Sequence, residues 1–478
     1  MTRRVAVVGA GAGGIAMGVA LKRAGYEFTI FDGADGFGGT WRHNTYPGAA
    51  CDVPSHLYSF SFALNPRWSK TYATQPEILA YLEGVARHHG LDEHLRAGTR
   101  VGSAAWSDER QSWTVTTASG SVETFDVIVT AVGMLDIPNI PHIPGIERFR
   151  GRVFHSSRWD HSRSVTGERV GSIGTGASAI QYVPAIARDV LSLTVFQRTP
   201  IWVSPRFDEP FTDEQMRTFT DQPEQMQALR DYIWQQYEDA SFDAGDEQTR
   251  KATELARSYL HRKVHDPDLR AKLTPAYPVG CKRPLLSRDW FPTLTAPHVR
   301  LVTVGVSEYT EAGLLTADGE EHELDTVIYG TGFTAADYLS SLSITGTAGR
   351  TLHDEWSDGA EAYLGTTVSG YPNLFTLYGP NTNGVNSILY IHEAQVRYVM
   401  SALDLLAESG ARSIDVKAQV QADYNQRLQD AMHGTVWLAN CNNYYRHPSG
   451  KVVTQLPYSG GEFARRTQRV DPADYDLT

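Results

Sequence analysis

The sequence predicts an α/β protein with two Rossmann-like dinucleotide-binding domains and a helical insertion in the second of them. A glycine-rich turn follows an apolar run near the N-terminus, and another follows the apolar run at residues 169–173. The polar segment 209–276, rich in Gln, Glu and Arg, then interrupts the second pattern. Because the chain has 478 residues, two or three domains sharing an interface are expected rather than one.

The first dinucleotide motif begins at residues 4–8, a nearly continuous apolar run that is typical of a strand buried in a parallel sheet. Gly9, Gly11 and Gly14 follow as G-x-G-x-x-G, then a helical pattern and a second strand that ends at Asp32. The glycines permit a tight turn and the close approach of a pyrophosphate, while the carboxylate accepts a hydrogen bond from a ribose hydroxyl. The motif predicts a dinucleotide site without separating FAD from NAD.

The second motif is the turn at residues 174–179, which reads GTGASA and is the G-x-G-x-x-A variant. The strand after it, residues 193–196, ends in Gln197-Arg198-Thr199 rather than in an acid. A carboxylate at this point would favour the free ribose of NAD, whereas a guanidinium can bind a 2′-phosphate. The second site is therefore predicted to bind NADPH in preference to NADH.

Two longer stretches join these motifs. Residues 38–52 read GGTWRHNTYPGAACD, with tight glycine and proline backbone, two aromatic rings and a single carboxylate, Asp52. Residues 149–160 read FRGRVFHSSRWD and lie between the two turns, so they are expected to be an ordered connector that sets how two nucleotides face each other. Taken alone, the first stretch could also be a loop whose aromatic rings cover the core.

Lys282 and Arg283 lie next to each other between a glycine and a proline. The constrained backbone is unusual for a solvated face, yet the residues alone leave surface charge and an anion site equally open.

The spacing of residues 38–52 and 149–160 resembles the two fingerprints of type I Baeyer–Villiger monooxygenases, flavoprotein oxygenases that turn ketones into esters or lactones. The resemblance covers nearly the whole chain. It implies that NADPH on the second fold reduces FAD on the first, that the reduced flavin captures O₂ as a C4a-peroxide, and that this peroxide attacks a ketone carbonyl. Two departures stand out, since relatives usually have Ala where this chain has Gly330, and some have Gln in place of Met134.

The resemblance also implies which residues form the site. Arg283 is expected to stabilise the negative charge of the peroxide, and Asp52 to orient that guanidinium. Residues expected at FAD are Gly9, Gly11, Gly14, Asp32, Gly39, Thr40, Trp41, Asp52, Tyr58 and Val101. Residues expected at NADP are Thr175, Gly176, Ala177, Ser178, Gln181, Arg198, Thr199, Lys282 and Arg283. His155, Trp159 and Trp437 are expected to act in conformational change or on the substrate side, with a core position as the alternative for Trp437.

Composition narrows the class of partner. A net charge of −12 argues against nucleic acid, and no apolar stretch reaches the roughly 18–20 residues of a membrane span. Cys51, Cys281 and Cys441 are odd in number and widely separated, so a disulfide scaffold, a zinc site and a dithiol centre are not expected. We expect a soluble cytoplasmic monomer or homodimer without a metal, acting on a small-molecule ketone and O₂.

Three other functions remain open on the sequence. A flavin-containing monooxygenase that oxygenates nitrogen or sulfur would share both folds, and a disulfide reductase would need a dithiol. A flavin-binding protein without turnover would show no substrate-stimulated consumption of NADPH. The ketone itself is not identified, because the pocket is expected to depend on the insertion, on residues 381–389 and on the C-terminal tail.

The expected division of the chain follows the motifs. The FAD domain is expected at 1–148 and 336–478, the connector at 149–160, the NADP domain at 161–208 and 277–335, and the insertion at 209–276. Within these, we expect a capping box at residues 74–77, a strand over 122–133 and a helix over 388–408.

Overall fold

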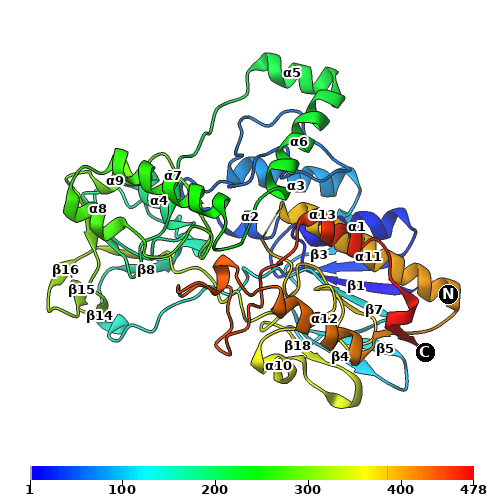
Figure 1. The fold of residues 1–478 in the computed structure, drawn as a ribbon. Coiled ribbons are helices and arrows are strands. Elements are labelled where there is room, and N and C mark those ends of the chain that lie inside the picture. Colours follow the sequence, from blue (N-terminus) through cyan, green and yellow to red (C-terminus); the bar gives the residue numbers. More distant parts are fainter. Residues whose placement is uncertain (1–2, 385) are drawn as a thin grey trace.

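Two five-stranded parallel sheets organise the chain, one in each half of the molecule (Figure 1). The computed structural model describes residues 3–384 and 386–478, so positions 1 and 2 of the first expected domain and position 385 of the expected pocket segment lie outside the described residues. The predicted α/β class is confirmed. We call the sheet β19-β7-β1-β2-β3 and the layers packed on it the first unit, and the sheet β13-β10-β9-β17-β8 with its layers the second unit.

The first unit has three layers. Alternate residues of its central strand point to opposite faces, so that Val5 and Val7 pack against helices while Ala6 and Val8 pack against an antiparallel sheet. The parallel strands are β1 (Arg4–Val8), β2 (Glu27–Phe31), β3 (Leu95–Arg96), β7 (Val127–Thr130) and β19 (Leu374–Thr376). The helices on one face are α1 (Ala12–Arg23), α3 (Gln75–His88) and α11 (Ile388–Ser409). The sheet on the other face contains β18 (Ser343–Thr345), β4 (Val101–Ser107), β5 (Ser112–Thr117) and β6 (Val122–Phe125).

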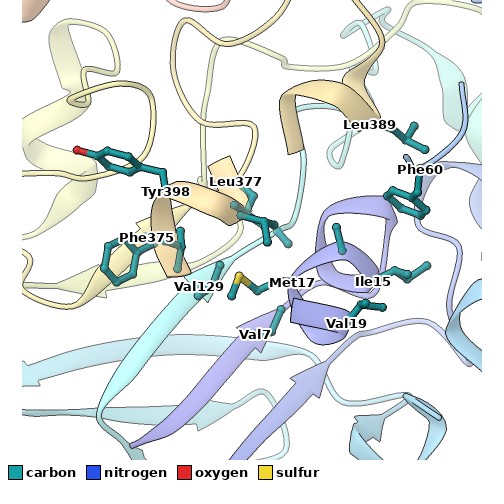
Figure 2. Packing of buried hydrophobic residues seen from close by; sticks show 14 of the residues in the cluster. Val7, Ile15, Met17, Val19, Phe60, Val129, Phe375, Leu377, Leu389 and Tyr398 are labelled. Carbon is teal, nitrogen blue, oxygen red and sulfur yellow. The ribbon is translucent and has the colours of Figure 1, made fainter. Parts of the chain in front are cut away.

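Figure 2 shows the core between the first sheet and its helices. Val7 of β1, Val129 of β7 and Phe375 of β19 meet Ile15 and Met17 of α1. Each of these side chains is almost completely buried. Burial of one such side chain is worth about 1.5–3 kcal/mol, which fixes α1 and the turn before it on the sheet.

The second unit repeats this arrangement. One face of its sheet packs against helices and the other against a small antiparallel sheet. The parallel strands are β8 (Arg152–His155), β9 (Arg169–Ile173), β10 (Ser192–Phe196), β13 (Val299–Val302) and β17 (Thr326–Tyr329). The covering elements are α4 (Ala179–Ile186), α9 (Trp290–Leu294), β14 (Val306–Tyr309), β15 (Gly313–Thr316) and β16 (Glu321–Glu323). Part of the expected connector is thus the edge strand of the second sheet.

Four helices form the expected insertion. Figure 1 shows that the first of them lie beside the first unit and the last beside the second unit. They are α5 (Asp213–Asp221), α6 (Pro223–Glu238), α7 (Glu247–Lys263) and α8 (Pro267–Leu273). Thr212 caps α5, because its hydroxyl accepts from the Gln215 N–H and the Gln215 side chain accepts from the Thr212 N–H. Arg230 of α6 is buried and donates to the carbonyl oxygens of residues 56, 57 and 59, which holds α5 and α6 on the first unit.

The chain passes between the two sheets twice, and the two connecting segments lie side by side. The N–H of Asn139 donates to the Gly332 carbonyl at 2.8 Å, and the N–H of Thr334 donates to the Ile137 carbonyl at 3.0 Å. These short antiparallel segments connect the two sheets at a single place.

The remaining elements are short or lie in the C-terminal part of the chain. The helices are α2 (Thr40–His43), α10 (Leu352–Glu355), α12 (Ala418–Asp430) and α13 (Gly460–Arg466), and the strands are β11 (Val203–Ser204), β12 (Leu285–Leu286), β20 (Ile414–Val416) and β21 (Tyr475–Leu477). The 3₁₀ helices are η1 (Asp92–His94), η2 (Ile146–Arg148), η3 (Ser156–Arg158), η4 (Thr347–Gly349), η5 (Trp356–Asp358), η6 (Val436–Leu438) and η7 (Pro472–Asp474).

Two local predictions were wrong. The capping box at residues 74–77 does not form, because Glu77 accepts hydrogen bonds from the N–H and hydroxyl of Ser69 instead. The single strand expected over 122–133 is divided at Asp126 into β6 and β7, which belong to different sheets. The carboxylate of Asp126 accepts from the Arg4 N–H at 2.8 Å, and this fixes the change of direction between the two strands.

Candidate active site

The glycine-rich turn of the first unit is in backbone contact with the loop 38–52. Gly9 and Gly39 have positive φ angles of 113° and 52°. A Cβ added to Gly39 would lie 2.7 Å from the Cα of Gly11, so position 39 has no room for a side chain. The helix α1 begins directly after this contact, and its free N–H groups face the place where a pyrophosphate is expected.

Asp32 closes the same turn from the end of β2. Its carboxylate accepts from the N–H of Ala10 at 2.6 Å and from the N–H of Ala34 at 2.7 Å. The acid is therefore held against the turn, at the position from which a ribose hydroxyl is recognised in this fold.

Two aromatic residues expected at the flavin lie together beside this turn. The indole N–H of Trp41 donates to the Tyr58 hydroxyl at 2.9 Å, and the two rings meet edge to face with centroids 5.8 Å apart. Trp41 lies in the short helix α2, which begins at Thr40. Val101 instead begins β4 and is buried in the core between the two sheets of the first unit.

The turn of the second unit is open where a pyrophosphate would approach. Gly174 has a φ of 105°, and a Cβ added to Gly176 would meet nothing within 4 Å. The expected contact residues Thr175, Ala177 and Ser178 belong to this turn, and α4 begins immediately after it.

Two cations expected at the 2′-phosphate lie near each other. Burial, and then the neighbouring charge of Arg198, lower the pKa of Lys282. The ammonium of Lys282 lies 5.4 Å from the centre of the Tyr277 ring. Within the described part of the chain, neither Lys282 nor Arg198 forms an ion pair with a carboxylate. Thr199 follows Arg198 directly at the end of β10, in the same turn.

Arg283 and Asp52 form a bidentate ion pair between the two units. The guanidinium donates from Nε to Oδ2 at 2.8 Å and from Nη2 to Oδ1 at 2.7 Å. Burial alone would raise the pKa of Asp52, but the charge of Arg283 outweighs it and leaves that pKa below the ordinary value. The charge of Asp52, opposed in part by burial, raises the pKa of Arg283, to which Tyr444 and Tyr445 add smaller contributions. The pair is therefore fully ionised at neutral pH.

Arg206 is a second cation close to Asp52, and sequence reasoning did not find it. Its Nη2 donates to the carbonyl oxygen of Cys51 at 3.2 Å and lies 3.3 Å from the carboxylate of Asp208. Its Nε is buried and lacks a hydrogen-bond partner among the described residues. Asp208 also accepts from Lys70 of the first unit at 2.9 Å. The contact is long-range, so no local pattern in the sequence could have signalled it.

Gln181 connects the second motif to the loop 38–52. Its Oε1 accepts from the Tyr46 hydroxyl at 3.0 Å, and its Nε2 donates to the Ala50 carbonyl at 2.9 Å. The residue expected at NADP thus also holds the two units in register, and its role at the cofactor stays a prediction.

The connector residues are ordered. The Nδ1 atom of His155 accepts from the Ser157 N–H at 3.1 Å, and burial lowers the pKa of this imidazole, so the ring is neutral. Trp159 packs against Phe154 and Tyr182 with ring centroids 5.2 and 5.5 Å apart.

Trp437 is almost completely buried and packs on Phe242, with ring centroids 4.6 Å apart. Trp437 thus belongs to the core of the first unit. Its expected place on the substrate side stays a prediction.

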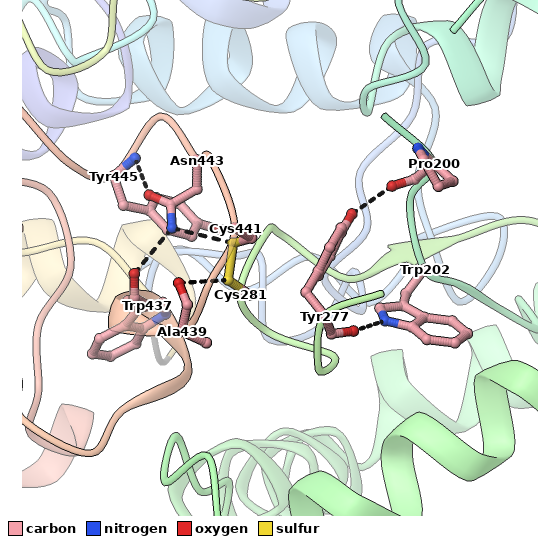
Figure 3. The surroundings of a disulfide bond; sticks show 9 residues. All are labelled: Pro200, Trp202, Tyr277, Cys281, Trp437, Ala439, Cys441, Asn443 and Tyr445. Atoms are coloured by element: carbon pink, nitrogen blue, oxygen red, sulfur yellow. Dashed lines mark hydrogen bonds between the residues drawn. A yellow bond between two sulfur atoms is a disulfide. The ribbon is translucent and has the colours of Figure 1, made fainter. Parts of the chain in front are cut away.

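The expectation for the cysteines was wrong. Cys281 and Cys441 form a disulfide, while Cys51 is free and buried (Figure 3). The two bonded residues are 160 positions apart, and only the tertiary fold brings them together. Burial raises the pKa of Cys51 to about 12, so this third thiol is unreactive.

A cleft of about 880 Å³ lies between loop 45–50, helix α4 and residues 286–298. Gln181 and Arg206 line it, but Asp52, Arg283, Lys282 and Arg198 do not. The cleft therefore borders the site around the ion pair through Arg206 but does not include the pair itself. Among the described residues, no helix has the length and apolar character needed to cross a bilayer.

Comparisons with known proteins agree with this geometry. Residues 2–226 match the family model described as flavin-binding monooxygenase-like. A Baeyer–Villiger monooxygenase of Streptomyces coelicolor is 42% identical over 99% of this chain and 92% of its own length. The structure resembles the closed crystal structure of cyclohexanone monooxygenase with a TM-score of 0.90 and 28% identity, covering all of both chains. It also resembles the crystal structure of OTEMO complexed with FAD and NADP, with a TM-score of 0.90 and 26% identity over 100% and 99% of the two chains. On the strength of this full-length identity, the chain belongs to the Baeyer–Villiger monooxygenases.

Proposed function

We propose that this protein uses FAD, NADPH and O₂ to convert a ketone into an ester or lactone, with Arg283 as the residue that acts at the reacting oxygen. Baeyer–Villiger relatives and structures that hold FAD and NADP support the reaction class and both cofactors. The observation that carries the assignment of Arg283 is its bidentate pair with Asp52, formed between the two nucleotide-binding units.

The residues present fit both cofactors. The contact of Gly11 with Gly39 leaves no side chain between the first turn and loop 38–52, and Asp32 is fixed at the ribose position. In the second unit, Gly176 faces open space and Lys282 and Arg198 supply positive charge without an internal counter-ion among the described residues. When bound, the flavin takes hydride from NADPH and activates O₂ for insertion beside the carbonyl carbon.

Arg283 would hold negative charge on oxygen in this reaction. A guanidinium is charged at every relevant pH, and its planar fork is fixed here by two hydrogen bonds to one carboxylate. Such preorganised donors stabilise charge that develops in a transition state, and loss of one donor typically lowers the rate by about 10²–10³-fold. Asp52 would act as the positioning residue, because it sets the plane of the guanidinium.

Lys282 and Arg198 would select NADPH by binding its 2′-phosphate, and Gly174–Ser178 would bind the pyrophosphate. His155 and Trp159 would act in domain movement, since the His155 ring packs on Phe333, in one of the segments that connect the two sheets, with ring centroids 5.6 Å apart. In this proposal the FAD domain comprises 1–148 and 336–478, the NADP domain 161–208 and 277–335, the connector 149–160 and the insertion 209–276.

We further propose a cytoplasmic location, because NADPH is regenerated inside the cell, and a monomer or homodimer as the active form. Which ketone is oxidised depends on side chains of the insertion, the described residues of 381–389 and the tail.

A ketone panel tests the function. Purified protein with FAD and NADPH should form esters or lactones from at least one linear, cyclic or aromatic ketone, with product masses higher than the substrate by one oxygen atom. Paired thioether substrates separate this reaction from sulfur oxygenation. Conversion of thioethers with no ester from any ketone would favour the flavin-containing monooxygenase alternative.

A further inference from the structure

The disulfide in Figure 3 joins the two stretches of chain that surround Arg283. Cys281 directly precedes Lys282 and Arg283 in the stretch 277–283, which we call the Lys-Arg loop. Cys441 lies in residues 436–445, which we call the C-terminal segment. The bond therefore ends one residue before Lys282 and two residues before Arg283.

The Lys-Arg loop is held firmly by the second unit. The indole of Trp202 donates to the Tyr277 carbonyl at 2.5 Å, and the Tyr277 hydroxyl donates to the Pro200 carbonyl at 2.6 Å. The N–H of Val279 donates to the Thr253 hydroxyl of α7 at 3.2 Å. Cys281 itself is completely buried among these residues. The loop is thus a fixed point to which another segment can be attached.

The C-terminal segment is anchored mainly at its two ends, where Val436, Trp437 and Tyr445 are almost completely buried in the core of the first unit. After η6 it contains no helix or strand until residue 446, and its side-chain hydrogen bonds are local. Asn443 donates to the Trp437 carbonyl at 3.0 Å and its Oδ1 accepts from the Tyr445 N–H at 3.1 Å. Yet this segment brings Tyr444 and Tyr445 to the side of Arg283, where both contribute to the pKa of the guanidinium.

Contacts other than the disulfide between the loop and the segment are limited. Val436 lies where a Cβ on Gly280 would come within 3.0 Å, and the Cys281 sulfur lies 3.8 Å from the Ala439 carbonyl oxygen. Neither contact involves residues 442–445. The covalent bond is therefore the main restraint on the middle of the segment, which lies between the buried residues Trp437 and Tyr445 and carries Tyr444.

We propose that Cys281 and Cys441 are positioning residues, whose disulfide holds the middle of the C-terminal segment beside Arg283 and whose reduction releases it. This proposal rests on the function assigned to Arg283 above. The side chain of Arg283 is already 38% exposed in this structure. In the released form Tyr444 moves away and more water reaches the guanidinium, so more of the NADPH consumed yields hydrogen peroxide and less yields ester. Hydride transfer from NADPH, which depends on the nucleotide turns, stays unchanged.

The Cys281–Cys441 disulfide forms from two thiols with hydrogen peroxide as the oxidant. Both S–H bonds and the O–O bond break, and one S–S bond forms. The two sulfur atoms together lose two electrons, the peroxide gains them, and the two thiol protons complete two water molecules. A small dithiol reverses the change by thiol–disulfide exchange and is itself oxidised to a disulfide. Disulfides are uncommon in reducing compartments, where those that occur are usually redox-responsive.

The first test concerns the bond and the segment, and it needs no substrate. Peptide mapping of the FAD-loaded protein under non-reducing conditions should give a 281–441 cross-linked peptide, while denaturing alkylation should label only Cys51. Hydrogen exchange of residues 438–445 should rise on the order of tenfold after reduction, and equally in C281S/C441S. Absence of the cross-linked peptide, or unchanged exchange in the double variant, would overturn the proposal.

The second test measures coupling, the ester formed per NADPH oxidised, on the best ketone of the panel. C281S/C441S should lose coupling by about threefold or more, with the rate of flavin reduction within about twofold of wild type. Reductant should lower coupling in wild type but not in C281S/C441S. The matched control is N442S, an exposed neighbour in the same segment, which should behave as wild type.

If the double variant is less stable but forms as much ester per NADPH oxidised as wild type, the disulfide has only a structural role and the proposal is contradicted. If the oxidised wild-type protein forms no ester at all, the proposed function fails. The peptide mapping and hydrogen-exchange measurements still decide whether the disulfide exists and restrains the C-terminal segment.

Discussion

Gly330 lies against the hydroxyl group of Tyr182, and a Cβ added at position 330 would stand 2.6 Å from that oxygen. Tyr182 is completely buried in α4, and its hydroxyl shares a hydrogen bond with Ser172 at 2.7 Å. The ring therefore cannot move aside. This explains why the chain has glycine where the resemblance to the family leads one to expect alanine.

We expect Gly330→Ala to destabilise the protein by about 1–3 kcal/mol, as is usual when a methyl group is forced into a packed interior. Tyr182→Phe should cost about 0.5–1.5 kcal/mol through the lost hydrogen bond. Because the phenylalanine ring leaves room for the new methyl group, G330A/Y182F should be more stable than the sum of the single effects. Chemical denaturation of all four proteins gives the coupling energy, and strict additivity would contradict this account.

The nucleotide turns illustrate what could be predicted from the sequence. Gly9, Gly174 and Gly39 have positive φ angles, which other residues adopt only with strain. Because this requirement is local, the spacing of the glycines in the sequence is enough to predict the turns. The strands and helices next to them follow from apolar periodicity, and β1 and β9 have the expected bounds.

The contacts that complete the site depend on tertiary structure and could not be predicted in the same way. Arg206 binds a carbonyl oxygen 155 positions away, and Gln181 binds Tyr46 from the other unit. The Cys281–Cys441 bond has no characteristic spacing either. The Arg283–Asp52 pair was expected only through the family resemblance, because nothing in the local sequence connects the two residues.

Selection of NADPH should depend on Arg198 and Lys282. We expect Arg198→Ala and Lys282→Ala each to lower kcat/KM for NADPH by about 10–100-fold, since a hydrogen bond to a charged group is worth about 1.5–3 kcal/mol. The value for NADH, which lacks the 2′-phosphate, should change little. Steady-state kinetics with both nucleotides measures this, and an equal loss for NADH and NADPH would argue for a general defect in binding.

Arg283 should matter after hydride transfer. We expect Arg283→Ala to retain FAD and to be reduced by NADPH, while ester formation falls by about 10²–10³-fold. Asp52→Asn should lower ester formation by a smaller factor than Arg283→Ala, because the guanidinium stays in place but is less well oriented. Stopped-flow reduction and product analysis separate the two steps, and near wild-type ester formation by R283A would remove this residue from the mechanism.

Arg206 should act on Arg283 indirectly, through the backbone of Cys51 and the charge near Asp52. We expect Arg206→Met to lower coupling of NADPH oxidation to ester by about two- to tenfold, and Arg206→Lys to recover part of the loss because it keeps the charge. Arg288→Met is a matched control, since Arg288 lines the same cleft but is exposed. If R206M keeps wild-type coupling and loses only thermal stability, the residue has a purely structural role.

His392 should make the fold sensitive to acid. It lies on α11 with its ring against Gly13 of α1, where a Cβ would come within 2.8 Å of Nε2, and its Nδ1 is buried without a partner among the described residues. Burial lowers the pKa of His392 to about 4, whereas the unfolded chain has a value of about 6.5. Between these two values the unfolded state binds more protons, so stability present above pH 6.5 is lost as the pH falls toward 4.

Each pH unit in that window can cost up to about 1.4 kcal/mol for one such group. His56 is buried as well, and its pKa is also lowered to about 4, so wild type carries at least two such contributions. His392→Gln removes the ionisable ring and should reduce the loss of stability between pH 7 and pH 5 by about half of the histidine contribution, whatever its effect at neutral pH. Urea denaturation of both proteins across this range tests the expectation, and parallel curves would show that His392 does not titrate on unfolding.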